Sequence, residues 1–99
     1  MREVVISARA QKNIANLFEY LELKWSVKVR EEFARKLHSN IKLIQINPEI
    51  FPISNVNPKY NKCVITKQST LFYRYDSTQI RILSLFDTRQ NPTKVNKIK

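Results

Sequence analysis

The sequence predicts an α+β protein in the order β-α-α-β-β-β, with a helical hairpin packed on a small antiparallel sheet. Apolar residues recur at helical spacing over residues 8–45, and three short β-rich runs with short links follow residue 60. The 99 residues, 42% of them hydrophobic, supply one modest core. We therefore expect one domain over residues 1–92 and a flexible basic tail over residues 93–99.

The first element is a strand that leads into a helix. Residues 3–6, Glu-Val-Val-Ile, form a short run with high β-propensity. Ser7, directly behind this run, is a suitable helix N-cap. Over residues 8–24 apolar side chains follow the period of an amphipathic helix, which ends at Trp25.

A second helix follows after one or two linking residues. Ser26 is its N-cap candidate, and apolar side chains repeat at helical spacing from residue 27 to about residue 45. Because the link is so short, the helices must pack antiparallel as an αα-hairpin. Asn47-Pro48 ends the second helix, and a loop with three prolines occupies residues 47–58.

Three strand candidates follow, over residues 60–66, 70–75 and 79–86, and their short links predict an antiparallel meander. If the last hairpin is centred on Ser77-Thr78, Arg74 lies directly opposite Arg81. One sheet face then carries an apolar set for the helices to cover: Leu71, Tyr73, Tyr75, Ile80 and Ile82. The other face carries Phe72, Leu83, Arg74 and Arg81.

The two facing arginines have alternative interpretations. Like charges directly across a strand pair are destabilising, which favours an anion or an acidic side chain that bridges them. Alternatively, both side chains splay into solvent, or an odd-length turn shifts the register, since Ser77-Thr78 carries no strong hairpin signal.

The composition excludes several functional classes. A single cysteine, Cys63, and a single histidine, His38, exclude an intramolecular disulfide and a Cys/His zinc site. We interpret Cys63 as a packing thiol. The absence of glycine excludes a Walker loop and a dinucleotide fingerprint, so we expect no cofactor. We also expect no metal. Without glycine, we expect asparagines to take turn positions with positive φ: Asn47, Asn55, Asn57, Asn61 and Asn91.

The charge is strongly basic and unevenly spread. The formal net charge is +10, of which residues 1–49 contribute +3 and residues 50–99 contribute +7. Such a field attracts nucleic acid, an anionic surface or an acidic protein. The apolar runs are far too short for a membrane span and no N-terminal signal pattern is present, so we expect a cytoplasmic protein without membrane contact.

Catalysis would need more than charge. A metal-free ribonuclease can work with positioned cations and a group that moves a proton, and Tyr73 or Tyr75 are the candidates for a weak acid. The sequence shows no paired carboxylates, no serine–histidine arrangement and no activated cysteine.

The order of elements resembles a known toxin superfamily. After the Asn-Pro that ends the second helix, the meander contains Leu-Phe-Tyr-Arg-Tyr-Asp over residues 71–76, and Arg-Gln-Asn-Pro over residues 89–92 ends the match. In order, spacing and size, residues 2–92 resemble the RelE/ParE superfamily of toxins from type II toxin–antitoxin modules. The resemblance implies a growth-inhibiting bacterial toxin, silenced by a cognate antitoxin in a hetero-oligomer.

The resemblance leaves the target open, because RelE-like members cut mRNA on the ribosome whereas ParE-like members inhibit DNA gyrase. Cleaving members carry lysines on the first meander strand, an arginine early in the second, an arginine after the last and a terminal tyrosine or histidine. Lys62 and Arg89 stand at two of these places, but Thr70 replaces the early arginine and Val95 lies near the terminal position. This departure favours the ParE-like branch.

Two alternatives stay open. A RelE-like ribosome-dependent mRNA endoribonuclease would use Arg89, Arg74 and Lys62 as phosphate ligands. A non-enzymatic basic module would bind nucleic acid with an affinity that falls steeply with salt. In all cases the antitoxin or partner should be acidic or amphipathic. The candidate target-binding residues are Arg74, Arg81, Arg89, Lys59 and Lys62.

Overall fold

The computed structural model of the chain describes residues 1–90, and its element order is the predicted β-α-α-β-β-β. Its elements are β1 (Glu3–Ile6), α1 (Ala8–Lys24), α2 (Val27–Ile46), β2 (Asn61–Val64), β3 (Ser69–Tyr75) and β4 (Gln79–Asp87). The predicted tail over residues 93–99, with Val95, lies outside the described residues. Among the helices of residues 1–90, none has the length and apolar character to cross a membrane.

The predicted N-caps are both confirmed. Ser7 Oγ accepts a hydrogen bond from the Ala10 N–H at 3.0 Å and donates to the Leu83 carbonyl at 2.9 Å. Ser26 Oγ accepts from the Val29 N–H at 3.1 Å. Ser7 therefore satisfies an orphan donor of α1 and also ties the start of this helix to β4.

We predict that Ser7→Ala destabilises the protein more than Ser26→Ala does. Loss of an N-cap costs about 0.5–2 kcal/mol, and Ser7→Ala also leaves the Leu83 carbonyl without its hydroxyl donor. Urea unfolding should place Ser7→Ala about 1 kcal/mol below Ser26→Ala in free energy of unfolding. Equal losses would show that the contact with β4 contributes nothing.

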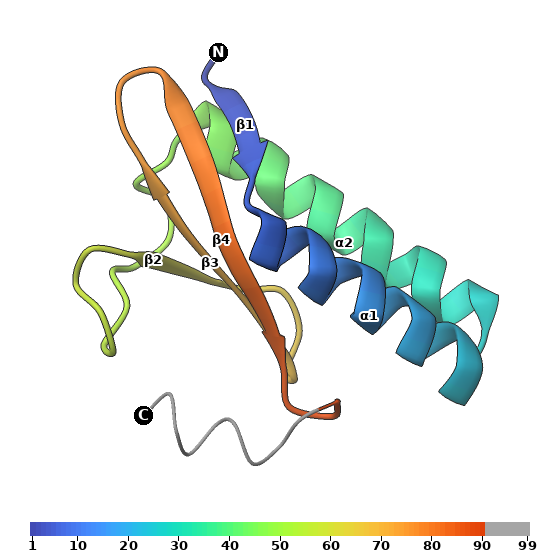
Figure 1. Cartoon of the computed structure of the whole chain (residues 1–99). Coiled ribbons are helices and arrows are strands. Elements are labelled where there is room, and N and C mark those ends of the chain that lie inside the picture. The colour runs from blue at the N-terminus through green and yellow to red at the C-terminus, as the bar shows by residue number, and fades with distance from the viewer. Residues whose placement is uncertain (91–99) are drawn as a thin grey trace.

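The described strands form one sheet in the order β1-β4-β3-β2. β2, β3 and β4 pair antiparallel, which confirms the meander, whereas β1 pairs in parallel with β4. The sheet is therefore mixed rather than wholly antiparallel, because the helical hairpin returns the chain so that β1 and β4 run the same way. α1 and α2 lie side by side against one face of the sheet (Figure 1). We call the opposite face the outer face.

The register of the last hairpin is the predicted one up to a bulge. Arg74 pairs with Arg81, and the flanking pairs on the helix side also agree. Between Phe72 and Tyr73 the register shifts, so that Phe72 pairs with Ser84 and Leu83 is the extra residue. Without the bulge, Leu85 and Asp87 would lie on the same face as Arg81. The extra residue turns both side chains to the buried side.

The core lies between the helices and the sheet. Its fully buried members come from α1, α2, β2, β3 and β4: Ala10, Leu17, Leu21, Ile44, Cys63, Leu71, Tyr73, Ile80 and Ile82. The predicted apolar face of the meander is thus confirmed, with Tyr75 packed at its margin. The Tyr73 hydroxyl donates to the Pro48 carbonyl at 2.8 Å, which fixes the loop after α2 to the core.

No residue among residues 1–90 has positive φ, so the prediction of positive φ is wrong for Asn47, Asn55, Asn57 and Asn61, while Asn91 lies outside the described residues. Their side chains satisfy the turn backbone instead. Asn47 Oδ1 accepts from the Glu49 N–H at 3.2 Å and Asn57 Oδ1 from the Lys59 N–H at 3.0 Å. An asparagine can therefore make a turn by hydrogen bonding to the backbone two residues on, without a left-handed conformation.

Candidate functional site

The first candidate site is a pair of arginines on the outer face. Arg74 of β3 and Arg81 of β4 are directly opposite each other and both are exposed. Within residues 1–90 neither guanidinium makes an ion pair. Side chains opposite each other in such a pair lie about 5 Å apart at Cβ, so the two charges repel unless an anion joins them. The pair is therefore suited to a bidentate acceptor such as a carboxylate or a phosphate.

Asp76 borders this pair and stays ionised. The backbone N–H groups of Thr78 and Gln79 and the Thr78 hydroxyl all donate to its Oδ1, at 2.8, 2.8 and 3.0 Å. These bonds, with a smaller contribution from the Arg81 charge, lower the pKa of the Asp76 carboxyl. Arg74, Tyr75, Asp76 and Arg81 line a shallow hollow. Asp76 partly offsets the Arg81 charge, which leaves Arg74 as the less compensated cation.

The predicted lysines lie at the other side of the same face. Lys62 of β2 pairs with Phe72 and is half-buried, two strand positions from Arg74. Diagonal neighbours in a sheet are about 7–8 Å apart, within reach of long side chains. Lys59 is exposed in the loop before β2. The structure thus places Arg74, Arg81 and Lys62 on one face, with Lys59 at its margin.

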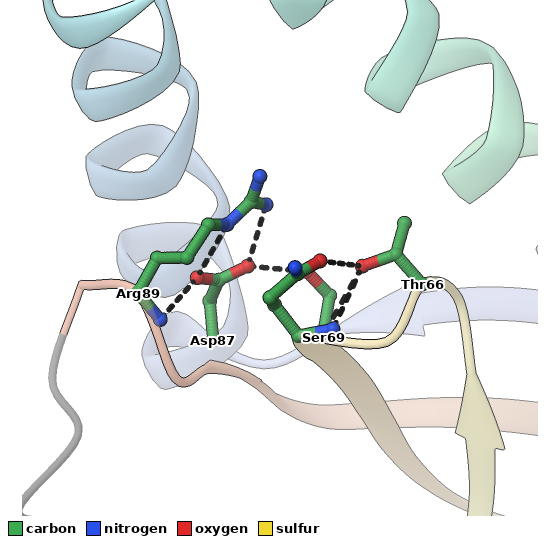
Figure 2. Close-up of polar contacts among 5 residues, drawn as sticks. Thr66, Ser69, Asp87 and Arg89 are labelled. Carbon is green, nitrogen blue, oxygen red and sulfur yellow. Dashed lines mark hydrogen bonds and ion pairs between the residues drawn. The ribbon is translucent and has the colours of Figure 1, made fainter.

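Arg89 lies elsewhere, in a polar network at the end of β4. Figure 2 shows its side chain against Asp87, next to Ser69 and Thr66. The Arg89 backbone N–H and Nε donate to Asp87 Oδ1 at 2.9 and 3.2 Å, and Nη2 donates to Oδ2 at 2.9 Å. Ser69 Oγ also donates to Asp87 Oδ2. Thr66 Oγ1 in turn accepts from the Ser69 N–H at 3.1 Å.

Asp87 is the centre of this network and is 5% exposed. Burial alone would raise the pKa of its carboxyl, but the hydrogen bonds from Arg89 and Ser69 and the Arg89 charge outweigh it and lower the pKa. The Arg89 side chain is 24% exposed. Asp87 therefore stays ionised and holds Arg89 in one orientation at the surface.

Arg89 lines a cleft of about 350 Å³ between the helical hairpin and the β2–β3 turn. Its floor is apolar and consists of Leu21, Val29 and Phe33. We call this feature the helix–turn cleft. Its rim carries Lys36 and Glu32 from α2, Lys67 from the turn, and Arg89.

The predicted cations therefore belong to separate places. Arg89 is bound by Asp87, which pairs with Ser69, the first residue of β3, whereas Arg74 is five residues further along the same strand. At 3.3–3.4 Å per residue this is about 17 Å. Arg89, Arg74 and Lys62 consequently do not converge on one phosphate, as the ribonuclease hypothesis requires.

One of the two candidates for a weak acid, Tyr73, is removed by burial, whereas Tyr75 is half-buried. Tyr73 is fully buried on the helix side, and desolvation raises the pKa of its hydroxyl to about 12. It cannot act as a weak acid on the outer face. Burial also raises the pKa of the Cys63 thiol to about 11, which agrees with its predicted packing role. Within residues 1–90, no group of three His, Cys, Asp or Glu side chains is arranged to hold a metal ion.

The sequence reasoning missed Lys36, Lys67 and Asp87. Lys36 follows Glu32 at a four-residue spacing beside the buried Phe33, a pattern that marks the rim of a helix face. By the two-residue period from Ile80 and Ile82, Asp87 would lie on the outer face with Arg81; its burial follows from the bulge at Leu83, which the sequence pattern does not indicate. Nothing in the sequence pattern indicates that the turn at Lys67 and α2 line the same cleft.

The comparison with protein families gives one match that covers most of the chain. Residues 4–92 match the family described as the ParE toxin of the type II toxin–antitoxin system, parDE. Over 75 residues the chain is 28% identical to Toxin ParE1 of Caulobacter vibrioides, an alignment that covers 75% of this chain and 77% of that toxin.

Solved structures share the fold at low identity. The chromosomal ParDE toxin–antitoxin system from P. aeruginosa gives a TM-score of 0.73 at 12% identity and covers 88% of this chain and 96% of that one. The E. coli DinJ-YafQ toxin-antitoxin complex gives a TM-score of 0.57 at 15% identity, with 91% and 96% covered. At these identities the likeness concerns the fold.

Proposed function

The chain belongs to the ParE toxin family of type II toxin–antitoxin systems, and we propose that it arrests growth by binding DNA gyrase through its outer face. Arg74 and Arg81, with Lys62, form the binding surface, and Lys59 extends it at the margin. The toxin acts in the cytoplasm by binding, without chemistry of its own. A cognate antitoxin neutralises it.

The observation that carries this proposal is the separation of the cations. A ribonuclease of the RelE type would need its phosphate ligands around one scissile bond, but Asp87 holds Arg89 beside the Ser69 end of β3, and the backbone of Arg74 lies about 17 Å from that of Ser69. Thr70, at the place of the early arginine, is a half-buried residue without a charge. The exposed Arg74–Arg81 pair can bind the carboxylates of an acidic patch on a protein without any of these catalytic parts.

The test is direct because the two targets give different readouts. Purified full-length protein at micromolar concentration should inhibit supercoiling by DNA gyrase, and should leave a reporter mRNA intact in a translation extract. Unaffected supercoiling would exclude the gyrase proposal. Cleaved reporter mRNA would instead establish the ribonuclease alternative.

The antitoxin part of the proposal has its own support. The ParDE system and the DinJ-YafQ complex are toxin–antitoxin assemblies of the same fold, and a toxin with net charge +10 favours an acidic partner. The cognate antitoxin is to be sought among small acidic reading frames beside this gene, and co-expression with it should restore growth and yield a stable complex. Growth arrest that persists in the presence of this protein would contradict the assignment.

A further inference from the structure

We propose that the helix–turn cleft receives a carboxylate side chain, together with a neighbouring apolar side chain, from an extended segment of the antitoxin. This inference rests on the proposed function, since it needs a neutralising protein partner. It adds the place and the chemistry of one anchor point, on the side of the molecule away from the Arg74–Arg81 pair.

The orientation of Arg89 is the first argument. Asp87 accepts hydrogen bonds from Nε, Nη2 and the backbone N–H of Arg89. Within residues 1–90, the Nη1 group of Arg89 is without a partner. Since Asp87 is itself fixed by Ser69, the guanidinium is held before any ligand arrives. A pre-oriented arginine loses less side-chain entropy on binding and presents a fixed geometry to a carboxylate.

The combination of floor and rim is the second argument. Leu21 and Phe33 are buried beneath the cleft, while Lys36 and Lys67 are exposed on opposite walls, one on α2 and one on the β2–β3 turn. A ligand that fills this space must be apolar where it meets the floor and anionic where it meets the rim. An acidic, amphipathic protein segment has this composition.

The charge balance separates this ligand from a nucleic acid. Glu32 stands on the same rim, and the Arg89 charge is already neutralised by Asp87. The two lysines against Glu32 leave a local charge of only about +1. Duplex DNA carries a charge about every 1.7 Å and is held by rows of cations, whereas one or two carboxylates need no more than this rim provides.

The test uses the full-length protein and its cognate antitoxin, identified as the small acidic protein whose co-expression restores growth. The cleft variant is Lys36→Glu combined with Lys67→Glu, which keeps the Asp87–Arg89 network intact. The matched control is Lys12→Glu combined with Lys42→Glu, two exposed helix lysines that do not line the cleft. Both variants change the net charge equally, so the general attraction between basic and acidic proteins is the same.

We expect the cleft variant to bind the acidic protein about 10–100-fold more weakly in calorimetry, and the control to stay within about 3-fold of the native chain. The cleft variant should still arrest growth, and co-expressed antitoxin should no longer rescue the cells fully. Equal affinities for the two variants would overturn the cleft assignment. Failure of the native chain to bind the acidic protein would instead refute the proposed function. A further outcome is that a short DNA duplex competes with the acidic protein for the native chain but not for the cleft variant. That result would make the cleft a nucleic-acid site and would also overturn the inference.

Discussion

Asp87→Asn should lower the stability of this toxin more than any other single substitution in its two polar sites. The substitution keeps the size of the side chain but removes its negative charge. It also weakens the hydrogen bonds that the carboxylate accepts from Arg89 and Ser69. Breaking a buried ion pair costs about 3–5 kcal/mol. Because the Arg89 side chain is 24% exposed and can turn to water, we expect a smaller loss of about 2–3 kcal/mol. For a domain of this size the melting temperature should fall by about 10–20 °C.

The pH dependence of this loss identifies its cause. The pKa of the Asp87 carboxyl is lower in the folded protein than in the unfolded chain, so the stabilisation is complete above the unfolded pKa of about 4 and disappears as the pH falls through the folded pKa. Urea unfolding between pH 7 and pH 2 should therefore show a gap between native protein and variant that narrows only below about pH 4. A gap that stays constant into acid would mean that the ionised carboxylate is not what stabilises the fold.

Asp76→Asn is the matched control for this experiment. Asp76 also has a lowered pKa and accepts three hydrogen bonds, but it lies in an exposed turn. Its replacement should lower stability less than that of Asp87, because water can replace the donors that it loses. An equal effect of both substitutions would show that burial of the Asp87 network carries no additional stability.

Most of the fold was predictable because its signals are local. The helical stripes, the serine caps and the period of the meander each need only a few neighbouring residues, and the Arg74–Arg81 pairing follows from the turn between them. The parallel pairing of β1 was not predictable in this way. It joins residues 3–6 to residues 79–82, and no local pattern states which edge of a sheet a distant strand will use.

The candidate site was predicted less completely for a similar reason. Strand alternation correctly placed Arg74 and Arg81 on the outer face, but Arg89 follows the end of β4, where alternation gives no direction. Its side chain is held by Asp87, whose own place depends on the bulge in β4 and on Ser69, 18 residues away at the start of β3. Neither of these is visible in a local pattern, so charge counting grouped Arg89 with four cations from which the fold separates it.

Reversing both arginines of the outer face should abolish the activity while leaving the fold intact. Arg74→Glu with Arg81→Glu exchanges one like-charged pair for another across β3 and β4, so the repulsion between the strands is kept and the melting temperature should change little. If the pair binds an acidic surface of gyrase, attraction becomes repulsion, and we expect the concentration that halves supercoiling to rise by about 100-fold or more. Growth arrest on induction should be lost in parallel.

Arg9→Glu with Arg35→Glu provides the control, since both arginines are exposed on the helices and the change in net charge is identical. This variant should retain most of the inhibition. Salt screens the attraction between charges further apart than a Debye length of about 10 Å, whereas it screens a direct ion pair in the bound complex much less. A third variant, Arg81→Glu alone, places opposite charges across the strands and should raise stability by a few tenths of a kcal/mol while still impairing inhibition. Loss of activity that tracks loss of the thermal transition in the double variant would assign the pair a structural role. Activity equal to that of the helix control would remove the outer face from the proposed mechanism, because an exposed guanidinium pair that gyrase does not need cannot be the surface that binds it.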